Sequence, residues 1–434
     1  MKTALKFLAL LVCCAWLSSC ENEQDNNAIS PRLSHKVKFE RDLSDAYRIA
    51  REYATSLTNT TRSGDSRQTA HNDVHYLTTE ATRATDGFDT LYYIVNYEDD
   101  KGFAIIPKNK LLPDVVVLTE QGNYNGEETD NELFNMLMNG AKAYAANSTR
   151  KPDSIILKPQ VPRPIYTDTI TLDTNYYIQP KTSTKWKQGH PYNILCIKNN
   201  EVCPAGCAAI VIGQIMAYYC YPTSMDITYA DRDINLQVLN WNFLNILPKH
   251  FDYDRLECGD HLMLARMIRE IGEQADITYT TNNSSTEDPN VRQALGYFGY
   301  NCSNIKDYSS IDIKNSLQND GLVYFSAADV YDTESRHAII IDGYIETEKH
   351  TRIWEAPWIW ESNDPYPWTL IVDNLVINRY IHCNFGLGGS ANGWYIDNLV
   401  KTDLCILPDD NTPAPNNAGH YTINPKIITD IKPE

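Results

Sequence analysis

Three cysteines lie close together in the stretch NEVCPAGCAAIVIGQIMAYYCYP, which runs from residue 200 to residue 222. The middle one, Cys207, follows Gly206 and opens an apolar run that is typical of a central buried helix. Free amides and the helix dipole favour negative charge at a helix N-terminus, so a thiolate is stabilised there and its pKa falls. Cys220 would lie near the opposite end. The sequence therefore predicts that Cys207 is the reactive thiol, the alternative being a buried structural one.

A nucleophilic cysteine needs a base, and the base needs a group that orients it. His337 stands in ESRHAIIIDGY, where a polar stretch gives way to a buried-strand pattern that would mount the imidazole rigidly. It lies about 130 residues after Cys207, a separation within the papain-like range. His382, in YIHCNFGLGG, is a second candidate base. Asn384, two residues later, would point to the same side of a strand.

Three other patterns accompany this pair. Gln188 lies nineteen residues before Cys207, and a side-chain amide near the nucleophile can donate to a developing oxyanion. The glycines after Asn384 lack the Gly-Lys-Ser/Thr ending of a phosphate-binding loop. Cys203 and Cys207 lack zinc-ligand spacing, and no nearby histidine or second pair completes a set. We expect neither a metal nor another cofactor.

Taken in chain order, these segments resemble the streptopain family of papain-like cysteine peptidases. The matching pieces are WKQGHPYN, CPAGCAAIVIGQIMAYYCYP, RHAIIIDGY and IHCNFGLGGSANGWY, spread over about residues 180–400. The resemblance implies that Cys207 is the nucleophile and His337 the base. It also implies that Gln188 and the Cys207 amide bind the oxyanion, and that Asn384 orients the histidine.

The fold implied by the resemblance is α+β and papain-like. A helical part faces an antiparallel sheet part, with a cleft between them, and a small α+β prodomain precedes both. Two features depart from the family pattern. The stretch Phe385-Gly386-Leu387-Gly388-Gly389 stands where the family usually has Trp-Gly-Trp-Gly-Gly, and Arg336 replaces the glycine that usually precedes the histidine. A cation beside His337 would disfavour its imidazolium, so both departures affect the expected efficiency.

The elements that would position these residues fall into two domains. A helix is predicted over residues 42–58, a β-hairpin over 90–107 and a second helix over 130–146. They form a cysteine-free propeptide or inhibitory domain at residues 33–150. A Pro-rich, basic linker with the activation cleavage follows at 151–175, then the peptidase domain at 176–410 and a tail at 411–434.

The N-terminus indicates location. Residues 1–19 have the layout of a secretory signal, and the small residues before Cys20 resemble a lipobox. Cleavage before Cys20 would leave a lipid-bearing cysteine on a flexible tether at residues 20–32. The acidic start of that tether resembles an export signal for the bacterial outer-membrane surface. The eight cysteines from Cys196 to Cys405 could pair in an exported protein, but the apolar surroundings of Cys220 and Cys383 favour free thiols.

These patterns predict an extracytoplasmic, lipid-anchored cysteine endopeptidase that is made as a zymogen. Its partners would be protein or peptide substrates, its own prodomain as an intramolecular inhibitor, and the membrane through the lipid. The net charge of −18 argues against nucleic acid as a partner. The alternative is a catalytically weak or inactive surface-binding lipoprotein that keeps the papain-like fold.

Overall fold

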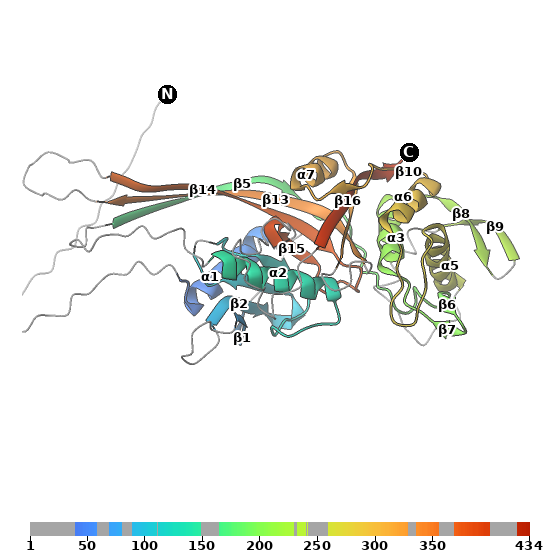
Figure 1. The fold of residues 1–434 in the computed structure, drawn as a ribbon, viewed down its shortest axis with the longest axis horizontal. Coiled ribbons are helices and arrows are strands. Elements are labelled where there is room, and N and C mark those ends of the chain that lie inside the picture. Colours follow the sequence, from blue (N-terminus) through green and yellow to red (C-terminus); the bar gives the residue numbers. More distant parts are fainter. Residues whose placement is uncertain are drawn as a thin grey trace, which may run out of the picture. The chain divides into compact units, whose positions relative to one another are not determined.

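The computed structural model describes residues 40–58, 69–79, 89–110, 112–148, 165–229, 232–239, 241, 259–328, 336–355, 369–399 and 423–434 (Figure 1). The predicted signal, Cys20 and the tether lie outside the described residues. So do residues 151–164 of the predicted linker and residues 411–422 of the predicted tail. Within the described ranges, no helix is long and apolar enough to cross a membrane.

The N-terminal domain combines four antiparallel strands with two helices. The helices are α1 (Leu43–Thr58) and α2 (Glu132–Ser148), and the strands, in spatial order, are β1 (Thr69–Thr79), β2 (Asp89–Tyr97), β3 (Phe103–Pro107) and β4 (Val117–Thr119). Strands β2 and β3 pair antiparallel and are connected through the short 3-10 turn η1 (Glu98–Asp100), so the predicted hairpin is present. The buried residues of α1 recur at helical spacing and belong to the same core as β2 and β3: Ala46, Ile49, Ala50 and Ala54.

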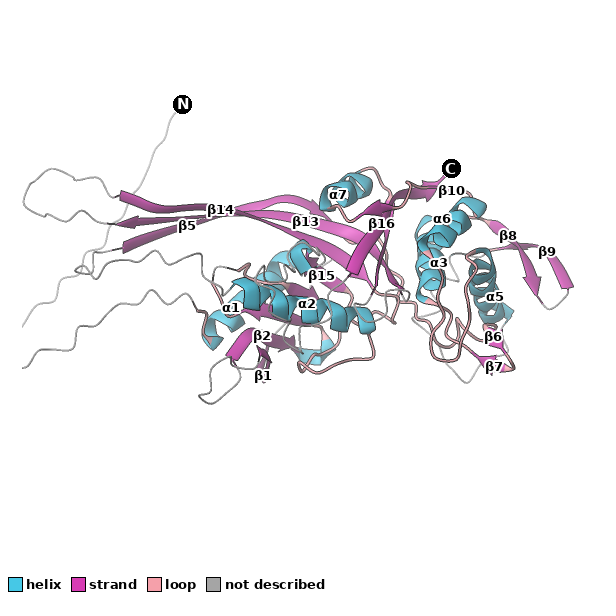
Figure 2. Ribbon diagram, viewed as in Figure 1, coloured by secondary structure: helices cyan, strands magenta, loops and turns pink. Residues whose placement is uncertain are grey.

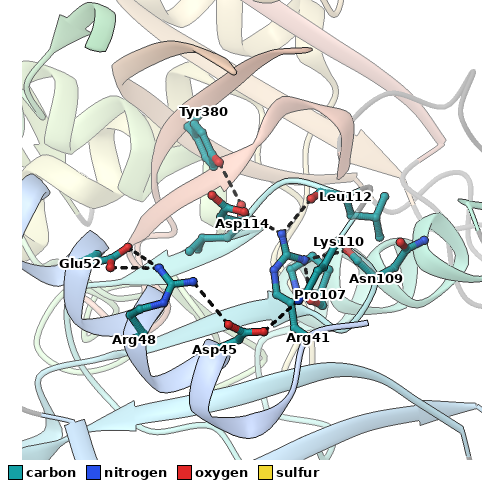
Figure 3. Close-up of polar contacts among 11 residues, drawn as sticks. Arg41, Asp45, Arg48, Glu52, Pro107, Asn109, Lys110, Leu112, Asp114 and Tyr380 are labelled. Carbon is teal, nitrogen blue, oxygen red and sulfur yellow. Dashed lines mark hydrogen bonds and ion pairs between the residues drawn. The ribbon is translucent and has the colours of Figure 1, made fainter. Parts of the chain in front are cut away.

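A buried arginine fixes the start of this domain (Figure 3). Arg41 is 3% exposed, and its guanidinium donates to the carbonyls of Pro107 (2.9 Å) and Asn109 (2.7 Å). It also forms an ion pair with Asp114 at 2.7 Å. Because a buried cation is costly unless it is fully paired, this residue ties the chain before α1 to the segment between β3 and β4.

The helical part of the peptidase domain surrounds α3 (Cys207–Tyr219), the predicted central helix. It is drawn in cyan in Figure 2 with α5 (Gly259–Gln274) and α6 (Asp288–Tyr297). Two hairpins belong to this part: β6 (Ile197–Lys198) with β7 (Glu201–Val202), and β8 (Ser224–Tyr229) with β9 (Arg232–Val238). Ten consecutive residues of α3, from Ala208 to Ala217, are buried. This matches the apolar composition on all sides of the predicted helix.

The sheet part is drawn in magenta in Figure 2 and is antiparallel. Its strands are β5 (Ile165–Ile178), β10 (Tyr300–Asn301), β11 (Lys306–Asp307), β12 (Leu322–Ala328), β13 (Arg336–Glu355), β14 (Thr369–Asn384), β15 (Gly393–Ile396) and β16 (Ile423–Pro433). Helix α7 (Ser310–Gln318) precedes β12, and the 3-10 turn η3 (Asp397–Leu399) follows β15. The strand order is β4-β15-β14-β13-β12-β16-β10, so β4 joins the N-terminal sheet to the peptidase sheet. The predicted α+β class, with a helical part, an antiparallel sheet part and a small α+β domain before them, is confirmed.

Residues on the two faces of β12 and β13 belong to different hydrophobic cores. Tyr324 and Ala338 lie in the core with the helices, whereas Phe325 and Ile339 lie in the core that the N-terminal domain shares. Because successive strand residues point to opposite faces, each strand has a buried face toward each part of the molecule. These two strands are therefore rigid mounts for the residues at their ends.

The structure differs from the sequence prediction at two segments. Residues 165–178, mostly within the predicted linker, form β5 and pair with β13 from Glu355 to Tyr344. Residues 423–433, in the predicted tail, form β16, which pairs with β12 and buries Ile427, Ile428 and Ile431 completely. Both strands pair with segments far away in the sequence, which local patterns do not reveal.

Candidate active site

Cys207 begins helix α3, as predicted. Gly206 precedes the helix with a positive φ of 90°, a conformation that favours glycine. A Cβ at that position would also lie 3.2 Å from the Ser284 carbonyl, so a larger residue would crowd the turn. Gly206 thus allows the chain to enter α3 sharply and places the Cys207 thiol beside the first amides of the helix.

The thiol of Cys207 faces the start of strand β13. Its Sγ atom lies 3.8 Å from the carbonyl oxygen of Arg336, and the backbone amide of Ala338 also interacts with it. Strand β14 ends at Asn384, opposite Ile340, and no other strand of the described ranges pairs with β13 before Ile340 on that side. His337 is the residue between the two backbone groups that contact the sulfur.

Strand alternation separates the side chains around this contact. His337 pairs with Ala327 of β12, and this register assigns its side chain to the face that carries Ala327 and Ile339. Arg336 and Ala338 belong to the opposite face. The structure therefore brings the main chain of His337 next to the sulfur. The imidazole extends from this same residue, on the face of β13 that carries Ile339.

The expected fall in the pKa of Cys207 is wrong for the uncut chain. Burial raises the pKa of this thiol, and the negative charge of Asp288 adds to the effect. The backbone amides of Ala338, Ala208 and Cys207 act in the opposite direction. The stabilisation of a thiolate by the helix N-terminus is therefore present, but burial outweighs it.

The other described cysteines are less suited to nucleophilic chemistry. The free thiols within the described part of the chain are those of Cys196, Cys203, Cys207, Cys220, Cys302 and Cys383. Burial raises the pKa of Cys196 to about 11 and that of Cys383 well above its usual value. Cys220 is exposed at the far end of α3, in the left-handed conformation.

Gln188 is held near the nucleophile through its backbone. The amide of Ala205, two residues before Cys207, donates to the Gln188 carbonyl at 2.9 Å. The glycine loop runs alongside, because Gly388 donates its amide to the Trp186 carbonyl at 2.8 Å. Gln188 is thus tied to the turn that enters α3, which agrees with a position at the oxyanion site.

Asn384 is buried and turned toward the helices. Its Nδ2 donates to the Thr184 carbonyl at 3.0 Å and to Gln214 Oε1 at 3.3 Å, and its Oδ1 accepts from the Gly386 amide at 3.1 Å. By register it lies opposite Ile340, three residues or roughly 10 Å along β13 from His337. These contacts fix the glycine loop, and the orienting role of Asn384 toward His337 stays a prediction.

The sequence reading missed Gln214 as a partner of Asn384. Its side chain is completely buried, and Oε1 also accepts a hydrogen bond from Thr184 Oγ1 at 2.9 Å. The signal was visible as a lone glutamine in the apolar run of α3. A single amide in a buried helix is expected to need polar partners.

His382, the second candidate base, lies elsewhere. Its register partner is Gly343, six residues along β13 from His337, a separation of roughly 20 Å. Nδ1 lies 2.6 Å from Asp342 Oδ1, and Nε2 lies 3.3 Å from Glu120 Oε1 of the N-terminal domain. His382 thus joins the two domains and does not reach Cys207.

The ion pairs keep His382 charged. Burial alone would lower its pKa, but the carboxylates of Asp342 and Glu120 outweigh burial and raise the pKa to about 10. A free histidine titrates near pH 6.5. Since the folded-state pKa is the higher one, the stabilisation is complete below about pH 6.5 and is lost as the pH rises through 10.

The departures from the family pattern take definite places in the structure. Phe385 is buried and packs on Tyr395, with ring centroids 5.5 Å apart. Leu387 is partly buried and forms an isolated bridge with Lys187. Arg336 pairs with Asp288, at 3.0 Å from Nε to Oδ2. The cation next to His337 is therefore neutralised by a carboxylate that sequence reasoning did not find.

Comparison with known proteins adds two family matches. Residues 186–395 match the peptidase C10 family, and residues 34–144 match the Spi protease inhibitor family. No curated protein matches the chain. The first range includes the four predicted site residues of the peptidase domain: Gln188, Cys207, His337 and Asn384.

Two solved structures are similar to the chain. A mutant fragment of prointerpain A from Prevotella intermedia is 16% identical with a TM-score of 0.47, and the match covers 83% of this chain and 99% of that one. The active interpain A cysteine protease from the same organism is 16% identical with a TM-score of 0.36, and the match covers 60% and 98%.

Proposed function

We propose that this chain, which belongs to the peptidase C10 family and is a cysteine peptidase with an inhibitor-like N-terminal domain, is a lipid-anchored endopeptidase. We also propose that it is made as a zymogen. The observation that carries the proposal is the contact of the Cys207 thiol, at the N-terminus of a buried helix, with the β13 backbone on both sides of His337. That contact brings the predicted nucleophile to the strand that carries the predicted base.

In the proposed mechanism, the Cys207 thiolate attacks the scissile carbonyl carbon. The oxyanion that forms accepts hydrogen bonds from the Cys207 amide and the Gln188 side chain. His337 passes its proton to the leaving amine, so the C–N bond breaks and a thioester remains. Water then hydrolyses the thioester and restores the thiol. Asn384 would support the loop beside the site.

The N-terminal domain would act as an intramolecular inhibitor. Strand β4 pairs with β15, and the Glu120 amide donates to the Asn392 carbonyl at 2.9 Å. Gln121 Nε2 donates to the Gly388 carbonyl at 3.2 Å, and its side chain also contacts Lys185. Through these contacts the N-terminal domain packs against the glycine loop, next to the proposed oxyanion site, and this position supports the inhibitory role.

Two contacts further from the site hold the same domain. One is the ion pair between Glu120 and the buried imidazolium of His382. The other is the hydrogen bond from the Tyr380 hydroxyl to the Val115 carbonyl at 3.0 Å, beside the Arg41 cluster in Figure 3. Buried, paired polar groups of this kind specify one docking position.

The proposed function is tested by an epoxide probe that alkylates active-site thiols, followed by identification of the labelled peptide. We expect a single label at Cys207 in the processed enzyme near neutral pH. A label at Cys220 or Cys302 instead would assign the chemistry to another thiol. A processed chain that takes up no label would favour the alternative of an inactive binding protein.

Activation is expected to follow a cut on the N-terminal side of Ile165. The sequence prediction placed the cut in the linker at residues 151–175, but Ile165–Ile178 is strand β5, which pairs with the strand that carries His337. Cleavage inside β5 would divide a strand of the peptidase sheet. Four basic residues stand before it: Arg150, Lys151, Lys158 and Arg163.

The measurement is N-terminal sequencing of the wild type and the Cys207→Ala variant expressed side by side. Shortening of the wild type alone would identify the cut as autocatalytic. A full-length chain that is fully active while uncut would contradict the zymogen proposal.

Membrane attachment is proposed to depend on the lipidated thiol of Cys20. The variant Cys20→Ala is expected to release the protein into the soluble fraction with unchanged peptidase activity, because it removes the anchor and leaves the peptidase domain intact. The check is fractionation of cells with an immunoblot, beside Cys220→Ala as a matched thiol control. A Cys20→Ala variant that still sediments with membranes would refute the anchor.

A further inference from the structure

The Arg336 side chain is bound by three separate elements. Its Nη2 donates to the Ser326 carbonyl of β12 at 3.0 Å and to the Asn424 carbonyl of β16 at 2.9 Å. Its Nε forms the ion pair with Asp288, the first residue of α6. The guanidinium therefore fastens the start of β13 to its neighbours at the point where the Arg336 carbonyl contacts Cys207 Sγ.

Each carboxylate oxygen of Asp288 has its own partner. Its Oδ2 pairs with Arg336, and its Oδ1 accepts a hydrogen bond from the Tyr324 hydroxyl at 2.9 Å. Asp288 is 7% exposed and Tyr324 is 2% exposed. A carboxylate is also favoured at the first turn of a helix. A buried carboxylate with two fixed partners keeps one position.

We infer that Asp288 is a positioning residue of the peptidase: its carboxylate holds the Arg336 guanidinium in place, neutralises that cation beside Cys207, and so fixes the Arg336 carbonyl against Sγ. The inference rests on the proposed function. It explains how this chain accommodates an arginine next to its catalytic histidine. The positive charge is matched by a carboxylate from α6.

Other charged groups around Cys207 define the background of the test. Helix α3 has no acidic or basic residue in its first turn. The pair of Asp288 and Arg336 is next to two further titratable groups: Tyr324 of β12, which donates to Asp288, and His337 of β13, which follows Arg336. Helix α5 packs on α3 and carries Arg266, the ion pair of Arg269 with Glu273, and Glu270, which accepts from Gln274. Of these groups, the pair of Asp288 and Arg336 is the one joined to the contact at Sγ.

The test compares the acid limb of the pH profile of kcat/KM in single and double variants. Asp288→Asn leaves an unpaired cation near the thiol, so the limb is expected to move to lower pH. Arg336→Gln leaves an unpaired carboxylate, so the limb is expected to move to higher pH. Each shift should be about 0.5 to 1 pH unit. The double substitution removes both charges and should return the limb close to the wild-type position.

Two further variants separate positioning from stability. Asp288→Glu keeps the negative charge, so the acid limb of its kcat/KM profile should stay at the wild-type pH. Glu346→Gln breaks the ion pair with Arg379, which also involves β13 but lies away from Cys207, and should leave the limb in place. A role in stability alone would lower the yield of active enzyme in Asp288→Asn and in Arg336→Gln without moving the limb in opposite directions.

The rate of Cys207 alkylation by iodoacetamide in the full chain gives a second readout of the same limb. A wild type that hydrolyses no peptide refutes the proposed function, while alkylation still measures the influence of Asp288 on the thiol. Opposite shifts in the two single variants with cancellation in the double variant support the inference. Shifts of the same sign, or none, overturn it.

Discussion

The variant Cys207→Ala is expected to lose at least about a thousandfold in kcat/KM for peptide hydrolysis and to keep its melting temperature. The substitution removes the sulfur that would form the thioester. The contact between Sγ and the Arg336 carbonyl is weak, at 3.8 Å, so little folding energy depends on it. Helix α3 is held by its ten buried residues from Ala208 to Ala217, which the change leaves in place.

The matched control is Cys220→Ala, which removes the same atom from an exposed position just after α3. It should have wild-type activity. The measurements are steady-state kinetics on the processed enzyme and thermal unfolding of each variant. Residual activity of Cys207→Ala above about a thousandth of the wild type would assign catalysis to another thiol.

The second large effect concerns the choice of base. His337→Ala is expected to lower kcat/KM by about 100- to 10,000-fold, because a cysteine without its base is mostly a protonated thiol near pH 7. The fold should survive, since His337 is only partly buried at the start of β13. The activity that remains should rise with pH as the thiol ionises.

His382→Ala provides the contrast and should act on stability. It would leave Asp342 buried without its ion-pair partner, a change that costs about 3–5 kcal/mol. The folded fraction should keep its kcat after processing, because His382 stands roughly 20 Å along the paired strands from His337, the predicted base. If folded His382→Ala loses more kcat than folded His337→Ala, then the assignment of the base is wrong.

Local patterns were sufficient for the parts of this chain whose structure is decided locally. The apolar run after Gly206 predicted α3, and the glycine predicted the turn that starts the helix at Cys207. The alternating strands around residues 90–107 predicted a hairpin because both partners lie within one short segment. In each case the residues that decide the structure are neighbours in the sequence.

Long-range partners could not be predicted in the same way. Strand β16 pairs with a segment about a hundred residues before it, and β5 pairs with a segment more than 160 residues after it. The pairs Asp288 with Arg336 and Glu120 with His382 join distant elements in the same manner. Their charges were visible in the sequence, but their partners were not.

The same distinction explains the error about the nucleophile. The position of Cys207 at a helix N-terminus was predicted correctly, and a single helix in water would lower the pKa of its thiol. Burial depends on everything that packs around the helix. In the uncut chain it raises the pKa and outweighs the helix amides.

The position of β16 sets an order in time during synthesis. This strand leaves the ribosome after every other described element, yet it lies inside the sheet between β12 and β10. At about 5–20 residues per second, the 285 residues between Ser148 and Pro433 take roughly 14 to 57 seconds to translate. A small domain folds well within that interval. The N-terminal residues are therefore made long before the sheet that carries His337 can close, but the core that they share with Phe325, Ile339 and Tyr395 is complete only after those strands have been made.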